Sequence, residues 1–560
     1  MKIIFTVLLI SVAFSSAAQN SDAIQSVVNQ ATALVGQGDN AGAIALLDSM
    51  NKITPNNFQI LNSLGQAYAR NQQQTEAIMA YEKALKIDPS VGRTHFFLGI
   101  SKAQADDLDG AFESMLEARS KGYNTTNVNF TPVNQKMSED DRYSRLFPSK
   151  KELADPFVEE TKIIHEIHGE TLGDQFGWIA RNIGDVDKDG IDDFVTSAPT
   201  NDEGANNAGK IYVYSGETAK LLWSAVGTYP NGRLGMGVEY GGDINNDGIP
   251  DVVAAAPFAN TAYAYSGDSG NILHTFEGDS TGGFGMHLSG VDDVNGDGFG
   301  DILIGEPYQR FNAPINGNSI DHAGKAHLYS GKDGRLLITW EGEEQADAFG
   351  TAVAGKKVGN SSWLIVGAPN AGPNNGGRVY VYNSISNDPK YVFEADSTAS
   401  RFGGMFLSVV GDVNADGEAD IYASDWGNNA NAPGTGRAYV YSGADGSNLL
   451  TLTGETAGEG LGIGVSDCGD VNNDGYDDVA VGSWQYAGAA ASGGRVSLYS
   501  GKDGGLIRTW TCKTMADTFG FDTTGLGDVD GDGTIDLLIT SAYSAIKGFQ
   551  SGRIFVISSK

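Results

Sequence analysis

The pattern of apolar and polar positions changes once along the chain, near residue 160. Between residues 21 and 122, apolar residues follow the spacing of a helix, in units of 34 residues that Pro55 and Pro89 mark. From residue 161 to 560 they form short runs of strand length between Gly-rich and Asp-rich turns, and the pattern returns after about 57 residues. The sequence therefore predicts a helical repeat domain, a linker at 123–160 and an all-β repeat domain.

The helical units have small and large apolar residues at the spacing that locks two antiparallel helices together. In the clearest unit these residues are Leu64, Gly65, Tyr68, Ala77, Tyr81 and Ala84. The units resemble tetratricopeptide repeats, which implies a short α-solenoid whose groove binds a peptide. A helical spacer without any ligand is the alternative. Within the linker, the sequence predicts one short helix around Ser149–Asp155.

The β units share one order of motifs. Each opens with Phe-Gly or Leu-Gly, at Phe176, Leu234, Phe284, Phe349, Phe402, Leu461 and Phe519. A short apolar strand ending in Ser-Ala-Pro or a variant follows, then Gly-Lys/Arg-x-Tyr-Val-Tyr-Ser-Gly, then Leu-Leu-x-x-Trp-x-Gly. The pattern thus predicts four strands per unit, except in the last unit, which supplies three. Strands such as Trp363–Val366 are apolar on both faces, and radially stacked blades cover both.

These units resemble FG-GAP repeats, the unit of the integrin alpha-chain propeller, over about 400 residues. The resemblance implies a seven-bladed β-propeller that binds its ligand through the loops after the second strand of each blade. Because the last unit supplies only three strands, Ile163–Gly169 is expected to complete the last blade. The predicted fold is therefore a short tetratricopeptide-like α-solenoid followed by a seven-bladed β-propeller closed by its N-terminal strand.

Six of the seven β units carry an acidic loop of the form Asp-x-Asp/Asn-x-Asp-Gly-x-x-Asp. The glycine at the sixth position permits a sharp turn, and several carboxylates within nine residues repel one another unless a cation lies among them. Hard oxygen ligands in this number suit Ca²⁺. The predicted calcium ligands are Asp185, Asp187, Asp189, Ile191 and Asp193; Asp243, Asn245, Asp247, Ile249 and Asp251; Asp293, Asn295, Asp297, Phe299 and Asp301; Asp412, Asn414, Asp416, Glu418 and Asp420; Asp470, Asn472, Asp474, Tyr476 and Asp478; and Asp528, Asp530, Asp532, Thr534 and Asp536.

The fourth unit is an internal control, because Ala354–Trp363 replaces the acidic loop with a segment that contains Lys356 and Lys357. We expect no cation there. The acidic loops also account for part of the formal net charge of -33. A charge of this sign excludes nucleic-acid binding, which depends on Lys and Arg.

The N-terminus predicts a signal peptide at 1–18, with one Lys, an apolar run from Ile3 to about Phe14, and small residues before Ala18. This implies a secreted, periplasmic or cell-surface protein, and no later segment is apolar enough to span a membrane. Export would permit a disulfide between Cys468 and Cys512, which the sequence neither requires nor excludes.

No catalytic or dinucleotide-binding motif occurs, so the sequence assigns no catalytic and no cofactor-binding residue. The favoured hypothesis is a calcium-stabilised adhesion module that binds protein or carbohydrate on its loop face, with the helical repeats recruiting a second protein. The loops that contain Tyr308–His322, Trp426, Trp484, Tyr486 and Tyr543 are the predicted ligand-binding surface, and the alternative is an ordinary variable loop with aromatic residues buried between blades. Two alternatives stay open, an extracellular enzyme that cleaves polysaccharide or phospholipid and a scaffold for assembly or export.

Overall fold

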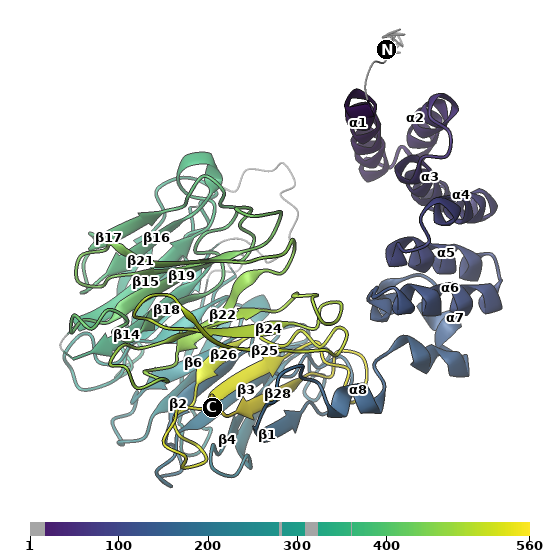
Figure 1. Ribbon diagram of the computed structural model, residues 1–560. Helices are drawn as coiled ribbons and strands as arrows, with labels where there is room; N and C mark the ends of the chain where they lie inside the picture. The colour runs from purple at the N-terminus through teal and green to yellow at the C-terminus, as the bar shows by residue number, and fades with distance from the viewer. Residues whose placement is uncertain (1–16, 279–282, 308–322, 360) are drawn as a thin grey trace. The chain divides into compact units, whose positions relative to one another are not determined.

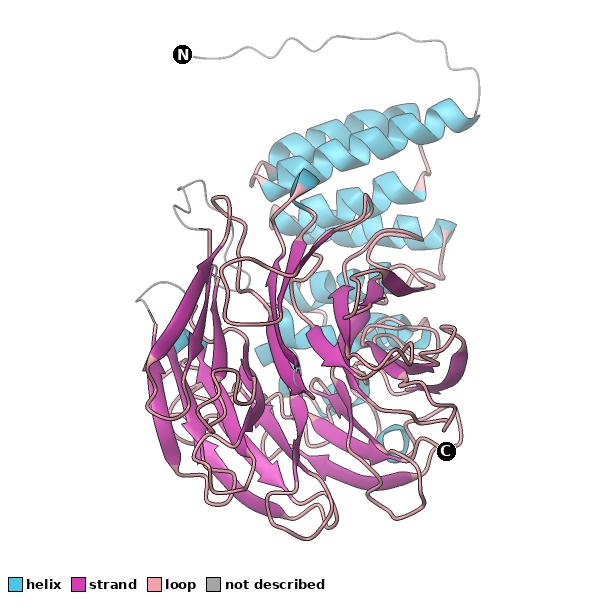
Figure 2. Cartoon of the chain, turned by 90° about the vertical axis from the view of Figure 1, so that its left-hand side faces the viewer, coloured by secondary structure: helices cyan, strands magenta, loops and turns pink. Residues whose placement is uncertain are grey.

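The computed structural model describes residues 17–278, 283–307, 323–359 and 361–560. They divide into two compact units on either side of the bond between Phe147 and Pro148. Figure 2 shows that the long helices belong to the first unit and the strands to the second. The apolar run predicted as a signal peptide lies outside the described residues, and within them no helix has the length and apolar content that a membrane span requires.

The first unit contains three pairs of helices in succession (Figure 1), as the sequence predicts. The helices are α1 (Ala17–Gly36), α2 (Asn40–Ile53), α3 (Phe58–Arg70), α4 (Gln74–Ile87), α5 (Gly92–Gln104) and α6 (Leu108–Ser120). A glycine lets the paired helices approach closely, since a Cβ on Gly65 of α3 would lie 2.5 Å from the ring of Tyr81 on α4. Gly99 of α5 makes the equivalent approach to Met115 of α6. The 34-residue period of the sequence therefore corresponds to one way of packing two helices that repeats along the unit.

The segment 123–160, which the sequence analysis treats as a linker, contains four short helices. They are η1 (Thr125–Phe130), α7 (Asn134–Ser138), η2 (Asp141–Leu146) and α8 (Lys150–Ala154). Val128, Val133, Met137 and Leu146 are buried against α5 and α6, so the first three short helices extend the core of the helical unit. Only α8 was expected. The other three were missed because their apolar residues are irregularly spaced among polar ones.

The second unit consists of seven four-stranded antiparallel sheets, which confirms the predicted propeller. Blades one to three are β2 (Ala180–Gly184), β3 (Asp193–Ala198), β4 (Lys210–Tyr214) and β5 (Leu221–Val226); β6 (Gly237–Gly242), β7 (Asp251–Ala256), β8 (Thr261–Tyr265) and β9 (Ile272–Glu277), with η3 (Pro257–Ala259); and β10 (Leu288–Gly290), β11 (Ile302–Glu306), β12 (Lys325–Tyr329) and β13 (Leu336–Glu341). Blades four to six are β14 (Val353–Val358), β15 (Ser361–Ala368), β16 (Arg378–Tyr382) and β17 (Tyr391–Glu394), with η4 (Pro373–Asn375); β18 (Leu407–Val410), β19 (Asp420–Asp425), β20 (Arg437–Tyr441) and β21 (Asn448–Thr453); and β22 (Leu461–Asp467), β23 (Val479–Ser483), β24 (Arg495–Tyr499) and β25 (Leu506–Thr511).

Blade seven is built from both ends of the second unit. Its strands are β26 (Thr523–Gly525), β27 (Leu537–Ser541), β28 (Arg553–Ile557) and β1 (Ile163–His168), in that order across the sheet. Strand β1 pairs antiparallel with β28, from His168 opposite Arg553 to Ile163 opposite Ile557. The outer strand of this blade therefore comes from the segment that precedes blade one.

The first strands of the seven blades lie around the axis, and each contacts the first strand of the next blade, β26 and β2 included. Second strands such as β3 and β7 are buried along their whole length because they lie inside a sheet and between two blades. The opening Phe or Leu of each unit is buried as well. Its backbone approaches the preceding blade so closely that Gly209, at φ +86°, would place a Cβ 2.2 Å from the carbonyl oxygen of Leu234.

Candidate functional site

The six acidic loops occupy one position in their blades, between the first and the second strand. All six therefore lie at the same end of the strands. The loops that follow the second strands lie at the other end, one strand length away. This arrangement separates the two faces of the propeller, and we call them the acidic face and the opposite face.

The first aspartate of every acidic loop holds the turn together. Its two carboxylate oxygens accept hydrogen bonds from the backbone N–H groups of the fifth and sixth loop residues, over N···O distances of 2.7–3.0 Å. The sixth residue is the glycine of the motif, with φ values such as +94° at Gly190 and +92° at Gly417. Only glycine adopts this conformation at little cost. The spacing of the motif thus fixes the turn that brings the side chains of alternate loop residues together.

The ninth aspartate begins or directly precedes the second strand and is buried in all six loops. One oxygen accepts from the N–H of the second loop residue, over 2.8–3.1 Å. In five loops the other oxygen accepts from the glycine after the third strand, Gly216, Gly267, Gly331, Gly443 or Gly501. The motif alone did not reveal this second contact, which links the loop to a residue about 23 positions further on in most blades.

Burial raises the pKa of these ninth-position carboxyls, against the opposing effect of the backbone hydrogen bonds. The pKa rises to about 6 for Asp193, Asp251, Asp478 and Asp536, and to about 7 for Asp301 and Asp420. Other loop carboxylates add to the rise, as Asp187 does for Asp193. The ionised loops are therefore costly by themselves, and a bound cation would offset that cost.

The donor set of the loops fits a hard cation best in blades one and seven. Asp185, Asp187 and Asp193 bring one carboxylate oxygen each within 4.8 Å of one another, and so do Asp528, Asp530 and Asp536. In the other four loops the third position is Asn, which offers an amide oxygen in place of a carboxylate. Among the described residues, the carboxylates of positions one, three and nine thus come together in two of the six loops, and the predicted ligands at positions five and seven are not part of these groups.

The blade-seven loop also contains buried oxygens without partners. Oδ1 of Asp530 and Oδ1 of Asp536 are buried and accept no hydrogen bond from any described residue. Blade seven has no glycine that corresponds to Gly216, and this leaves Asp536 with one oxygen unsatisfied. A buried carboxylate oxygen without a partner is costly, and a cation among these oxygens would satisfy both.

Two lysines from the ends of the propeller contact the same loop. Lys162, just before β1, pairs with Asp530, and Lys560 pairs with Asp532 over 3.2 Å. Because both residues lie far from the loop in sequence, the motif could not reveal them. Their ammonium groups balance part of the charge of this loop.

The segment that replaces the acidic loop in blade four is a regular hairpin. Strands β14 and β15 pair without interruption up to Val358 opposite Ser361. Lys357 donates from its backbone N–H to Asp292 and from Nζ to the backbone oxygen of Asp293, over 3.1 and 2.7 Å. Blade four thus has a hairpin in place of the acidic loop, and Nζ of Lys357 contacts the acidic loop of blade three.

On the opposite face, three of the predicted aromatic residues lie in a patch with Trp178, which is partly buried like them, and with Phe521, which is buried. The patch consists of Trp178, Trp426, Trp484, Phe521 and Tyr543, packed on one core cluster. The ring centroids of Trp484 and Tyr543 are 6.0 Å apart, and those of Trp178 and Phe521 are 4.8 Å apart. Nε1 of Trp484 is buried and has no hydrogen-bond partner among the described residues. Tyr486 lies apart from these contacts, beneath the guanidinium of Arg495. The predicted loop Tyr308–His322 lies outside the described residues.

The two cysteines, and the two histidines of β1, have contacts within the propeller. Cys468 and Cys512 are both buried and free, so they do not form a disulfide in this structure. His165 faces the backbone oxygens of Gly216 and Glu217, whereas His168 pairs with Glu166. The two imidazoles therefore do not share a ligand.

Comparison with known families agrees with this architecture. A model described as FG-GAP repeat matches residues 176–214, 240–273 and 284–329, which contain the first three acidic loops. A model described as tetratricopeptide repeat matches residues 58–91, the helical unit of α3 and α4.

Known proteins similar to the propeller are integrin alpha chains. The chain is 33% identical to mouse integrin alpha-8 over 208 residues, which is 34% of this chain and 19% of the integrin. It is 29% identical to integrin alpha-5 of Xenopus laevis over 214 residues, 35% of this chain and 19% of the integrin. The matched part thus spans about a fifth of the length of these relatives. The chain thus contains FG-GAP repeats within a seven-bladed β-propeller that is similar in part to integrin alpha chains, preceded by tetratricopeptide-like helical repeats.

Proposed function

We propose that this protein is a calcium-binding adhesion module, secreted, periplasmic or displayed at the cell surface, that binds a protein or a glycan on its opposite face. The observation that carries the proposal is the set of six acidic loops on one face of the propeller, separated from a half-buried aromatic patch on the other. The similarity to integrin alpha chains supports the same division of roles.

Calcium acts on stability in this proposal. The buried ninth-position aspartates and the partnerless oxygens of Asp530 and Asp536 make the ionised loops unfavourable without a cation. A cation bound by the folded loops converts its binding energy into folding energy. Six such loops on one face hold the first and second strands of six blades in register, and the aromatic patch lies at the other end of the same strands.

The aromatic patch is the ligand-binding surface in this proposal. Indole and phenol rings offer a large apolar area together with a hydrogen-bond donor, a combination that suits both sugar rings and protein side chains. The helical unit would bind a second protein, as tetratricopeptide-like repeats suggest, and so connect it to whatever the propeller binds.

The test is a screen of the immobilised full chain against a glycan array and a panel of extracellular-matrix proteins, in calcium and after chelation. We expect a ligand whose binding falls at least tenfold on chelation and on the substitution Trp484→Ala. The matched control is Trp223→Ala, which removes a tryptophan of an outer strand whose Nε1 already donates to the carbonyl of Gly267. Binding that ignores both chelation and Trp484→Ala would refute the proposed surface, and so would the absence of a binder in both panels.

A further inference from the structure

The propeller axis contains a polar cavity that neither the acidic loops nor the aromatic patch involves. The cavity has a volume of about 270 Å³ and lies at the acidic-face end of the first strands. Residues of all seven first strands line it, among them Arg181 of β2, Glu239 of β6, Lys356 of β14 and Asp467 of β22. Ligand pockets for drug-sized molecules begin at roughly 300 Å³, so this cavity suits a smaller molecule.

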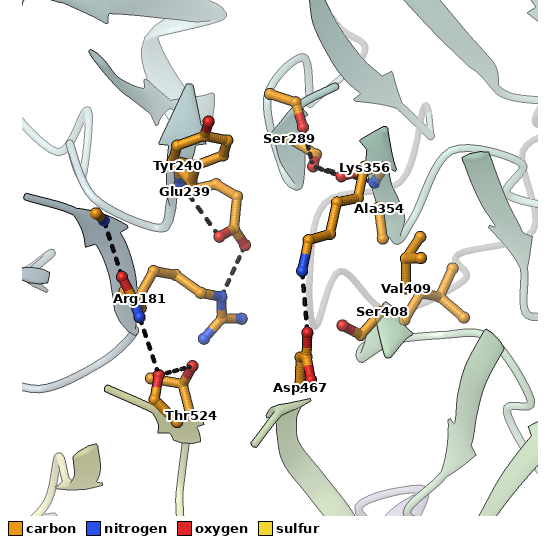
Figure 3. A pocket seen from close by; sticks show the side chains of 16 residues that line it. Arg181, Glu239, Tyr240, Ser289, Ala354, Lys356, Ser408, Val409, Asp467 and Thr524 are labelled. Carbon is orange, nitrogen blue, oxygen red and sulfur yellow. Dashed lines mark hydrogen bonds and ion pairs between the residues drawn. The ribbon is translucent and has the colours of Figure 1, made fainter. Parts of the chain in front are cut away.

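Two ion pairs face each other across the cavity (Figure 3). On one side, Nε of Arg181 donates to Glu239 over 2.7 Å, and on the other Nζ of Lys356 donates to Asp467 over 2.9 Å. Each pair joins different blades, so the four charges have fixed places in the ring. Asp522, which is fully buried, also accepts from Arg181 and holds its guanidinium in position.

Both cations keep donors that the protein does not use. Within the described part of the chain, Nη2 of Arg181 has no hydrogen-bond partner, because its recorded bonds come from Nε and Nη1. Among the described residues, Nζ of Lys356 donates only to Asp467, which leaves two of its three N–H groups. The hydroxyl of Ser408, which also lines the cavity, has no hydrogen-bond partner in the part of the chain that the structure describes. These donors are sufficient to bind a carboxylate.

Both anions keep acceptor capacity in the same way. Beyond the ion pairs, Glu239 accepts one backbone N–H, that of Tyr240 over 3.2 Å, and Asp467 accepts that of Gly469 over 3.1 Å. Each carboxylate has about four lone-pair sites, so two or more stay open on each. An ammonium group, with three donors and no acceptor, is the complement of such sites.

The balance of charge selects the class of ligand. A simple anion would meet Glu239 and Asp467, and a simple cation would meet Arg181 and Lys356. Like charges brought together in a partly desolvated site repel each other strongly. A molecule that carries both a carboxylate and an ammonium a few bonds apart pairs with all four side chains. Ala354, Leu407 and Val409 also line the cavity and offer an apolar surface for a small side chain.

We propose that the axial cavity is a binding site for a small zwitterion of the α-amino acid type. The carboxylate lies between Nη2 of Arg181 and Nζ of Lys356, and the ammonium lies between Glu239 and Asp467. The site shares no residue with the predicted calcium ligands or with the aromatic patch. Its failure would therefore leave the proposed adhesion function untouched.

Isothermal titration calorimetry of the full chain in calcium tests this proposal, with L-alanine and L-leucine as probes. L-Alanine methyl ester lacks the carboxylate and N-acetyl-L-alanine lacks the ammonium, so each keeps one half of the recognition. We expect saturable binding of at least one free amino acid and at least tenfold weaker binding of both blocked forms. Glucose is the neutral polar control.

Variants then locate the site. Lys356→Met and Asp467→Asn should each weaken binding about tenfold or more, whereas Lys356→Arg should keep most of it. Lys220→Met changes an exposed lysine away from the cavity and should have no effect. Thermal unfolding of each variant shows whether it is folded, and because the side chain of Lys356 is 46% exposed we expect Lys356→Met to fold. Equal binding of the blocked amino acids, unchanged binding by Lys356→Met, or no binding of any free amino acid would overturn the proposal.

Discussion

Removal of calcium should lower the melting temperature of the propeller by an amount that the number of loops sets. A site that binds only the folded state stabilises it by about 1.4 kcal/mol when free calcium is ten times the dissociation constant. Six sites therefore contribute about 8 kcal/mol. An unfolding entropy of about 2.1 cal/mol/K per residue, over about 400 residues, equals about 0.8 kcal/mol for each degree. The expected shift on chelation is thus about 10 °C.

Differential scanning calorimetry of the full chain, in about 10 mM calcium and then in excess chelator, measures this shift. Asp189→Ala changes one loop at a position that is Asp in all six, and it should reduce the calcium-dependent part by about one sixth, or about 2 °C. Asp333→Asn, in an exposed turn outside the acidic loops, is the matched control and should keep the full shift. A shift of less than about 2 °C on chelation would refute the reasoning. So would a full shift retained in Asp189→Ala.

Three further predictions follow from particular contacts. The ninth-position carboxyls have a pKa of about 6 to 7 in the folded protein, against an ordinary value of 3.8. Their contribution to the stability of the metal-free protein is therefore present at low pH and is lost as the pH rises through 6 to 7. Melting curves in chelator should show this loss, and the calcium-induced shift in melting temperature should grow over the same pH range. Gly65→Ala should destabilise the helical unit by about 1 kcal/mol or more, because the clash of the new Cβ with Tyr81 exceeds the gain in helix propensity. Gly36→Ala is the control, since a Cβ there meets no atom within 4 Å, and it should not destabilise the unit. Urea unfolding measures both effects. Arg553→Met should lower the free energy of unfolding by about 3–5 kcal/mol, because it leaves the carboxylate of Asp517, fully buried and 2.8 Å from the guanidinium, without this partner. A double variant with Asp517→Asn should recover part of that loss. An unchanged stability of the single variant would contradict the argument.

The sequence could predict the parts of this structure that repeat. The 34-residue helical unit and the seven copies of one strand pattern each repeat the same packing several times. The repeated apolar positions can therefore be recognised even where a single copy would be ambiguous. The acidic loops could be predicted for the same reason, since the turn depends on a glycine and carboxylates within nine residues. The hydrogen bonds of Asp185 to the amides of Asp189 and Gly190 are local contacts that the motif itself encodes.

The features that do not repeat could not be predicted in the same way. The short helices of 123–146 pack by four irregularly placed apolar residues, which have no period to detect. The pairing of Lys162 with Asp530 joins positions 368 residues apart and occurs once. The axial cavity depends on which side chain each first strand places at the centre of the ring, and these side chains differ from blade to blade. Charged residues such as Arg181 and Glu239 are ordinary in sequence and become a site only when the ring closes.

Blade four, which has no acidic loop, contributes positive charge next to acidic residues of other blades. Its two adjacent lysines point to different neighbours, as successive residues of a strand should. Lys356 pairs with Asp467 of blade six across the axis, and Lys357 reaches the start of the acidic loop in blade three. Coulombic attraction by Asp467 raises the pKa of Lys356 against the opposing effect of burial, so its charge is kept. The same blade thus supplies positive charge to two others, and its hairpin continues to Val358. In place of an acidic loop, blade four therefore places the ammonium of Lys356 at the axis and that of Lys357 beside the acidic loop of blade three.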